Sequence, residues 1–171
     1  MTLLNKLLFS LLLCLFWPTA SLALENDSTA PIKVSADKAE FQQAKGSAIY
    51  TGNVYLQQGS IEIRADKMEL IADQGVLKEA YVFGGSEDKQ RALLKQKNED
   101  GSWTEGQAEQ IHIEQASGDI ELKGNARLDD GNSTIKGPLI HYNSRQQTVE
   151  AQSDGDNSDR VEMIFKPAAT E

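Results

Sequence analysis

A stretch that occurs twice, 72 residues apart, constrains this chain more than any other feature. The first copy, Gly46–Leu70, reads GSAIYTGNVYLQQGSIEIRADKMEL, and the second, Gly118–Tyr142, reads GDIELKGNARLDDGNSTIKGPLIHY. The two Gly-Asn pairs set the offset, because 124 − 52 = 72. Repeats of this kind form arrays in which each unit buries its apolar face against its neighbours. The sequence therefore predicts a repeated architecture.

Within each copy, apolar residues alternate with polar ones at a period of two. In the first copy, Val54 and Leu56 precede a turn at Gln57–Ser60, and Ile61 and Ile63 follow it. Two alternating runs around a short glycine-containing turn are typical of a β-hairpin with one buried face. Helix signals are nearly absent, so the pattern indicates an all-β sandwich, roll or barrel.

The alternation changes phase at the same place in both copies. Ile63 is odd-numbered and Met68 is even-numbered, and the second copy makes the same change between Ile135 and Ile140. A one-residue slip normally sends the apolar residues of a strand to the wrong face. A slip that occurs in both copies therefore suggests a bulge or corner where the strand bends. Pro138 lies at this corner, where a missing N–H is tolerated. We therefore expect a bent roll of antiparallel hairpins with two incompletely closed sheets.

The amino terminus has the form of a cleavable secretory signal. Lys6 precedes an apolar run, Leu7–Leu15, and Ser21-Leu22-Ala23 supplies small residues at a cleavage site. The run is short for a membrane span, although a retained anchor is the alternative. These features predict a signal peptide at 1–23, a polar leader at 24–30, one β domain at 31–167 and a polar tail at 168–171.

Composition excludes several classes of function. Cys14 is the only cysteine and lies in the predicted signal, so the exported chain has no thiol for a disulfide or a metal. Removing Lys6 leaves 17 − 1 = 16 basic against 26 acidic side chains, a formal charge of −10. Because nucleic-acid binding needs a basic face, nucleic acid is not expected as a partner.

No catalytic or metal-binding constellation emerges from the sequence. His112 and His141 lie inside alternating segments, and neither is accompanied by an elbow motif or a cysteine that could complete a triad. We interpret both as surface histidines of strands. The sequence predicts no enzyme, no catalytic residue, no metal site and no cofactor.

The motif TGNVYLQQGSIEIRADK, at 51–67, resembles the OstA-like repeat of lipopolysaccharide transport proteins, and the resemblance covers about 31–167. It implies a bent β-jellyroll in the periplasm whose apolar interior receives the acyl chains of lipopolysaccharide. It also implies head-to-tail homo-oligomers that bridge an LptC-like inner-membrane protein and an LptD-like outer-membrane translocon. Gly137-Pro138-Leu139 departs from the family's usual Gly-Asp-Lys triplet, which concerns the pairing of this strand.

Two sets of candidate site residues follow. The predicted interior, lipid-binding set is Ile32, Val34, Phe41, Val54, Leu56, Ile61, Ile63, Met68, Val82, Leu94, Ile111, Ile113, Ile120, Leu122 and Ile135, and Gln58 is expected to point outward. The predicted protomer and partner edges are Ile32, Lys33, Val34, Val161, Met163 and Phe165. Exposed strand edges can pair with another chain, although Lys33, Arg160 and Lys166 could instead prevent pairing.

Other readings of the same residues stay open at this point. The interior residues could fill a dry core, since pocket walls and cores share one composition. The chain would then be an envelope scaffold that links partners through its edges. A soluble relative of the LptC-type partner is a third reading, which the cleavage site at Ala23 disfavours, and an envelope hydrolase finds no supporting residue.

Overall fold

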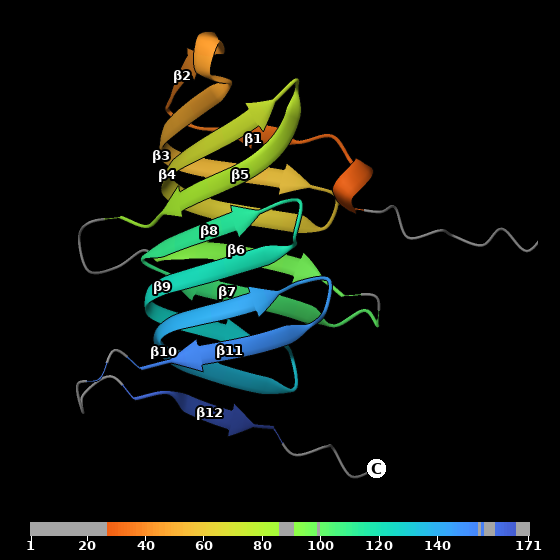
Figure 1. The fold of residues 1–171 in the computed structure, drawn as a ribbon, viewed down its shortest axis with the longest axis vertical. Coiled ribbons are helices and arrows are strands. Elements are labelled where there is room, and N and C mark those ends of the chain that lie inside the picture. Colours follow the sequence, from red (N-terminus) through yellow and green to blue (C-terminus); the bar gives the residue numbers. More distant parts are fainter. Residues whose placement is uncertain (1–26, 86–90, 99, 154, 156–159, 167–171) are drawn as a thin grey trace, which may run out of the picture.

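The computed structural model describes residues 27–85, 91–98, 100–153, 155 and 160–166 (Figure 1). The predicted signal peptide, the start of the polar leader and the polar tail lie outside these residues. Two 3₁₀ turns, η1 (Asp27–Thr29) and η2 (Gln43–Lys45), accompany the strands. The strands are β1 (Lys33–Ser35), β2 (Lys38–Gln42), β3 (Ser47–Gln58), β4 (Ile61–Asp73), β5 (Val76–Phe83), β6 (Ala92–Lys97), β7 (Trp103–Ala108), β8 (Gln110–Glu114), β9 (Asp119–Asp129), β10 (Ser133–Asn143), β11 (Thr148–Gln152) and β12 (Glu162–Phe165).

Four long strands, β3, β4, β9 and β10, bend and take part in two sheets. The first part of β4, 62–64, pairs with β6, whereas 67–73 pairs with β5. In β9 the order is reversed, since 119–123 pairs with β8 and 127–129 pairs with β7. All pairings are antiparallel. The predicted all-β, bent jellyroll with two incompletely closed sheets is therefore confirmed (Figure 1).

The corner of the roll lies where the sequence changes phase. The register between β3 and β4 shifts between Thr51 and Val54, and that between β9 and β10 shifts between Gly137 and Leu139. Pro138 occupies the shift, so its missing N–H costs no ladder hydrogen bond. The triplet that departs from the family pattern therefore leaves β10 paired with β9 on both sides of the corner.

Both copies build this corner with the same backbone and side-chain contacts. Gly52 and Asn53 have φ of 78° and 46°, and Gly124 and Asn125 have 79° and 45°. Glycine and asparagine are the residues that adopt such positive φ most readily. Asn53 Nδ2 donates to Asp37 Oδ2 (2.9 Å), and Asn125 Nδ2 donates to Glu109 Oε1 (2.6 Å). Since 109 − 37 = 72, the repeat includes the acidic residue whose carboxylate accepts the hydrogen bond from the asparagine amide.

The two repeats are six-stranded units, β1–β6 and β7–β12. The offset is 72 up to the end of β4, because Ala72 N donates to Gly46 O (2.8 Å) as Ser144 N donates to Gly118 O (2.9 Å). Beyond the following turn it falls to 69: Leu70 pairs with Ala80, while Tyr142 pairs with Val149, and 149 − 80 = 69. The first hairpin is three residues longer, because seven residues lie between the paired Ile71 and Glu79 and four between the paired Asn143 and Thr148.

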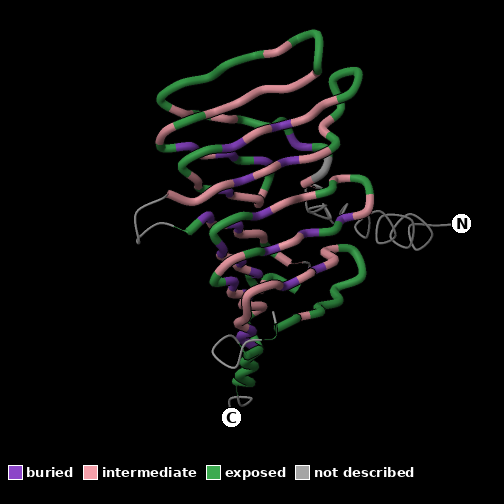
Figure 2. Tube along the Cα trace, turned by 60° about the vertical axis from the view of Figure 1, so that its left-hand side comes forward, coloured by how far each residue is buried: buried purple, intermediate pink, exposed green. Residues whose placement is uncertain are grey.

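Small side chains gather where the two sheets meet at the corner. Ala65, Ala92, Ala108 and Ala126 lie beside it, and all but the first are at most 2% exposed. Small residues let the two sheets converge there. Further out, Gly106 faces Leu122 of the opposite sheet, and a Cβ on Gly106 would lie 2.8 Å from Leu122 Cδ2. Buried residues occupy the middle of the roll, and the turns and both ends are exposed (Figure 2).

Each sheet is continuous through the middle of the molecule and ends on an unpaired edge. In the middle, β5 pairs with β8 and β6 pairs with β7. We call this junction of the two repeats the seam. At the N-terminal end, β1 and β2 pair with β3 alone among the described strands, and at the C-terminal end β11 and β12 pair with β10 alone. The sequence predicted edges at β1 and β12 and missed those at β2 and β11.

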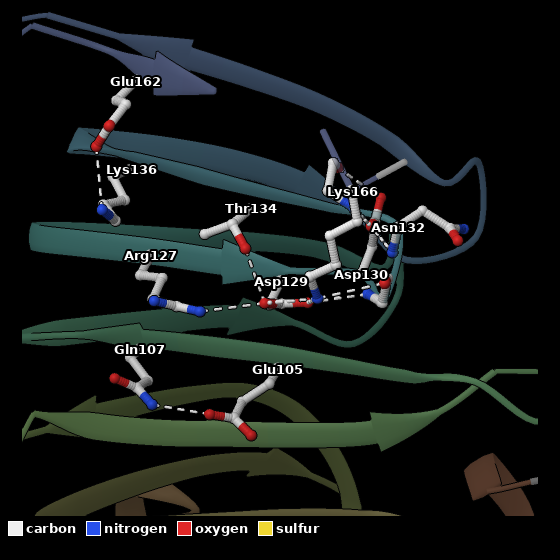
Figure 3. A network of polar contacts seen from close by, with 12 residues as sticks. Glu105, Gln107, Arg127, Asp129, Asp130, Asn132, Thr134, Lys136, Glu162 and Lys166 are labelled. Carbon is white, nitrogen blue, oxygen red and sulfur yellow. Dashed lines mark hydrogen bonds and ion pairs between the residues drawn. The ribbon is translucent and has the colours of Figure 1, made fainter. Parts of the chain in front are cut away.

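A polar network fixes β12 to the rest of the roll (Figure 3). Lys166 Nζ donates to Asp129 Oδ1 (3.0 Å), and Lys136 Nζ donates to Glu162 Oε2 (3.0 Å). Thr134 Oγ1 adds a hydrogen bond to Asp129 Oδ2 (2.8 Å). The C-terminal edge is therefore held in place by charge-assisted hydrogen bonds, which are the stronger kind.

Candidate functional site

A groove of about 510 Å³ runs between the two sheets on the side away from the corner. Its walls are aliphatic because the inward-facing positions of both sheets carry branched side chains at this depth. The wall residues are Leu56, Ile61, Ile63, Leu77, Ala80, Leu94, Ile113 and Ile120. Its volume lies within the range of small-molecule sites, about 300–1,000 Å³.

Polar residues form the rim of this groove. The rim residues are Asp27, Gln58, Gln96, Glu114, Gln115, Ser144 and Arg145. Asp27 is tied to the β3–β4 turn, since Ser60 N and Ser60 Oγ donate to its carboxylate at 2.7 and 2.6 Å. An apolar floor under a polar rim suits a ligand with an apolar chain and a polar head.

A second hollow, of about 840 Å³, opens at the N-terminal end of the roll. Ile32, Val34 and Phe41 line it from β1 and β2 and the residue before them, and Leu70 and Leu77 line it from deeper in the roll. Leu77 also belongs to the groove wall, so the two hollows adjoin. The apolar lining is thus continuous from the groove to the N-terminal end.

The structure divides the predicted interior residues into three groups. Those in the groove wall are Leu56, Ile61, Ile63, Leu94, Ile113 and Ile120. Those that pack in the core without lining the groove or the N-terminal hollow are Val54, Met68, Val82, Ile111, Leu122 and Ile135. Those at the N-terminal opening are Ile32, Val34 and Phe41.

Two of these residues are not buried. Ile32 and Phe41 are 39% and 72% exposed, because they lie at an edge where no further strand covers them. The interior position predicted for them is therefore corrected to the rim of the N-terminal opening. Val34 is half-buried and packs against the core.

Gln58 points inward, so its predicted outward position is wrong. It has the same parity along β3 as Leu56, and its side chain is 7% exposed. Its Nε2 donates to the backbone oxygen of Ala30 (3.2 Å), which satisfies the buried amide. The alternation already carried this signal, and it was missed because Gln58 was assigned to the turn.

Both histidines lie on the outer face of one sheet, as predicted. His112 Nε2 lies 3.2 Å from Glu79 Oε2, and its ring stacks on Tyr81 with ring centroids 4.4 Å apart. Tyr81 Oη donates to the same carboxylate (2.6 Å), and this bond together with the His112 contact lowers the pKa of Glu79. The described residues contain no group of three or more His, Cys, Asp or Glu side chains that could hold a metal ion. No helix among them is long and apolar enough to cross a membrane.

Comparison with known proteins assigns the chain to a family. A family model described as LptA/(LptD N-terminal domain) LPS transport protein matches residues 33–148. The lipopolysaccharide export system protein LptA of Escherichia coli (strain K12) is 32% identical over 167 residues, which cover 96% of this chain and 88% of that protein. LptA of Haemophilus influenzae is 28% identical over 166 residues, covering 96% and 92%.

A solved structure shares the fold. The crystal structure of LptH, described as the LptA-homologous periplasmic component of the lipopolysaccharide transport device of Pseudomonas aeruginosa, superposes with a TM-score of 0.73 at 24% identity. The match covers 82% of this chain and 99% of LptH. The chain belongs to the LptA/LptD N-terminal domain family of lipopolysaccharide transport proteins.

Proposed function

We propose that this chain carries lipopolysaccharide across the periplasm by holding its acyl chains in the groove between the two sheets. Membership of a lipopolysaccharide transport family and the names of the relatives support the transport role. The observation that carries the acyl-chain site is the aliphatic groove with its polar rim. The periplasmic location rests on the predicted signal peptide and on the description of LptH.

The energetics of the ligand explain why a carrier is needed. Each methylene exposed to water costs about 0.8 kcal/mol, so an acyl chain of about a dozen carbons resists crossing an aqueous space by roughly 10 kcal/mol. A groove that is aliphatic along its wall and open toward the end of the roll can shield such a chain while it moves.

We propose further that copies stack head to tail through their unpaired edges. At the seam, Ala80 pairs with Ile113, and Leu94 pairs with Gly106. The structural offsets place Val149 and Phe41 in the positions of Ala80 and Ile113, and Met163 and Val34 in those of Leu94 and Gly106. A second copy that repeats the seam would bring Val149 against Phe41 and Met163 against Val34.

The exposure of these residues supports the stacking proposal. Phe41, Val149, Met163 and Phe165 are 72%, 36%, 49% and 72% exposed. Unpaired strand edges are templates for pairing with another chain, and apolar residues that cluster there indicate a partner. Lys166, one of the residues that could prevent pairing, is directed to Asp129 and away from the free edge of β12.

The same edges would receive the membrane-bound partners. An LptC-like inner-membrane protein and an LptD-like outer-membrane translocon are proposed at the two ends of the stack. The matching family model also covers an LptD N-terminal domain, which supports a partner with strands of the same kind.

Photo-crosslinking in the exported protein tests the lipid site. A photoreactive amino acid at Leu56 or Ile113, both in the groove wall, is expected to capture lipopolysaccharide. Gln57, whose side chain is exposed on the outer face of β3, is the matched control and is expected to stay silent. Capture at neither wall position, in a folded protein, would favour the scaffold with a dry core.

A further inference from the structure

The rim of the groove carries one cationic side chain among the described residues that line it, and this is Arg145. It lies in the turn between β10 and β11, beside the turn that joins β8 to β9. The corresponding position of the first repeat, at an offset of 72, is Asp73. The rim is therefore cationic at the second repeat and not at the first.

Neighbouring residues hold the Arg145 side chain in position. Its Nη2 donates to the backbone oxygen of Gln115 (3.0 Å), and its backbone N donates to Asn143 Oδ1 (3.1 Å). The side-chain stem lies over Gly118, where an added Cβ would come within 2.7 Å of Arg145 Cγ. Gly118 also has φ of +79°, which favours glycine, so the stem has room that another residue would fill.

The Arg145 guanidinium has no acidic partner within ion-pair distance in the described part of the chain. By contrast, Arg127 lies 3.1 Å from Asp129, and Arg64 lies 3.7 Å from Glu62. The two acids on the same rim have other partners, since Asp27 accepts hydrogen bonds from Ser60 and Glu114 accepts one from Ser117 Oγ (3.0 Å). Arg145 is thus a positioned cation whose charge is not neutralised by the protein.

We propose that Arg145 binds the anionic headgroup, a phosphate or carboxylate, of the lipid whose acyl chain lies in the groove. This inference rests on the proposed function. A guanidinium presents a planar fork of donors that fits phosphate or carboxylate oxygens with two hydrogen bonds. Its place above the aliphatic wall fixes the orientation of the lipid, with the chain directed inward and the charged head at the rim of the second repeat.

Two detergents that share a chain and differ in head test this site. Binding of dodecyl phosphate and dodecyl maltoside to the exported protein would be measured by calorimetry below their critical micelle concentrations. The wild type is expected to bind dodecyl phosphate about tenfold more tightly, the effect of one charge-assisted contact. Arg145→Gln is expected to remove this preference while leaving the affinity for dodecyl maltoside unchanged.

Three controls distinguish a specific headgroup site at Arg145 from a non-specific effect of the protein's positive charges. Lys123→Gln removes one positive charge from the exposed outer face of β9 and is expected to keep the preference. Arg145→Lys keeps the charge without the fork and is expected to retain part of it. Inorganic phosphate at the same concentration, which has no chain, is expected not to displace dodecyl phosphate.

The results test the headgroup site separately from the proposed acyl-chain site in the groove. If neither detergent binds the wild type, the acyl-chain site itself is contradicted. Three results would overturn the headgroup site at Arg145 without contradicting the acyl-chain site. They are equal binding of both detergents, a preference that persists in Arg145→Gln, and displacement of dodecyl phosphate by inorganic phosphate.

Discussion

The seam in the middle of the roll and the two ends are built from equivalent strands, yet they differ in what covers them. At the seam, β5 meets β8 and β6 meets β7, and Val82 and Ile111 are at most 1% exposed. At the ends, β1, β2, β11 and β12 offer the same kinds of edge, and Phe41 and Phe165 are each 72% exposed. The chain thus contains one complete junction between repeats and, at its two ends, the edges from which the proposed stacking would build another.

This difference is the structural basis of the proposed stacking. A repeat buries its apolar face against a neighbouring repeat, and a terminal repeat lacks one neighbour unless it is capped. Neither end of this chain carries a polar cap over its edges in the described residues. The seam therefore serves as the model for a joint between copies, and the predictions below test that equivalence.

The largest expected effect separates the packed middle from the N-terminal end. Leu122→Ala, at a fully buried position, is expected to lower the free energy of unfolding by about 3 kcal/mol through lost burial and a residual cavity. Tyr50→Ala, at the equivalent position of the first repeat (122 − 72 = 50), is expected to cost about 1 kcal/mol because Tyr50 is only partly buried. Equal losses in urea unfolding would contradict the distinction between middle and end.

An edge substitution should separate association from folding. Phe41→Asp is expected to weaken self-association at least tenfold, because a charge would replace the aromatic ring that the proposed joint places against Val149 of the next copy. The free energy of unfolding should change by no more than about 1 kcal/mol, since the side chain is 72% exposed and loses an edge-to-face contact with Tyr50. Sedimentation over a range of protein concentrations measures the association. The matched change Val76→Asp, at an exposed residue outside the four edge strands, should leave it unaltered.

Low pH should destabilise the C-terminal edge strand β12 at a higher pH than it destabilises the middle of the roll. Burial alone would raise the pKa of Asp129, but hydrogen bonds from Lys166 and Thr134 hold it well below its usual range. A carboxyl with a lowered folded-state pKa contributes stability that is complete above its unfolded value, near 4, and is lost as the pH falls further. Asp129→Asn is expected to cost about 1–2 kcal/mol at pH 7 and to flatten the pH dependence below pH 4.

Hydrogen exchange at β12 provides the measurement. In the wild type, amides of β12 should exchange faster as the pH is lowered from 4 to 2, after correction for the intrinsic rate, while amides of β9 stay protected. Unchanged protection of β12 in the Asp129→Asn variant would contradict the anchoring role of the network in Figure 3.

The smallest expected effect concerns like charges at the joint. The seam places Tyr81 against His112, and the equivalent joint between copies would place Glu150 against Glu40. Directly opposed like charges destabilise a pair of strands by roughly 0.2–1 kcal/mol. Glu150→Gln is therefore expected to strengthen stacking by up to about fivefold. The effect should fall below this limit because Lys38 already forms an ion pair with Glu40 and reduces the repulsion. Weaker stacking of Glu150→Gln, with Glu121→Gln as the control, would contradict the proposed register.

The sequence predicted the fold well because its two strongest signals act locally. The period of two identified the strands, and the phase change after Ala65 marked the corner that the register shifts confirm. The sequence could not separate Leu56 in the groove wall from Met68 in the packed core. Both alternate in the same way, and the difference depends on their distance from the corner.

Other features were missed for physical reasons that can be named. The fall of the repeat offset from 72 to 69 before β11 was not predicted, because it depends on the length of the hairpin between β4 and β5, which the repeat itself does not encode. No sequence pattern marked Arg145 as a site residue, because its position at the groove depends on two turns that meet in space. Gln58 was misassigned although its parity with Leu56 was visible.

Disulfide trapping of the joint between copies tests the central claim most directly. The seam pair Val82 and Ile111 predicts that Ala151 lies opposite Ala39 of the next copy. Without the predicted signal peptide, which contains Cys14, the chain has no cysteine, so an Ala39→Cys/Ala151→Cys variant should form a ladder of covalent multimers on mild oxidation. The variant Ala39→Cys/Gln152→Cys, one residue out of register and on the opposite face, should form no covalent multimers. Equal cross-linking of both variants, or of neither at concentrations where the wild type associates, would contradict a joint that repeats the seam.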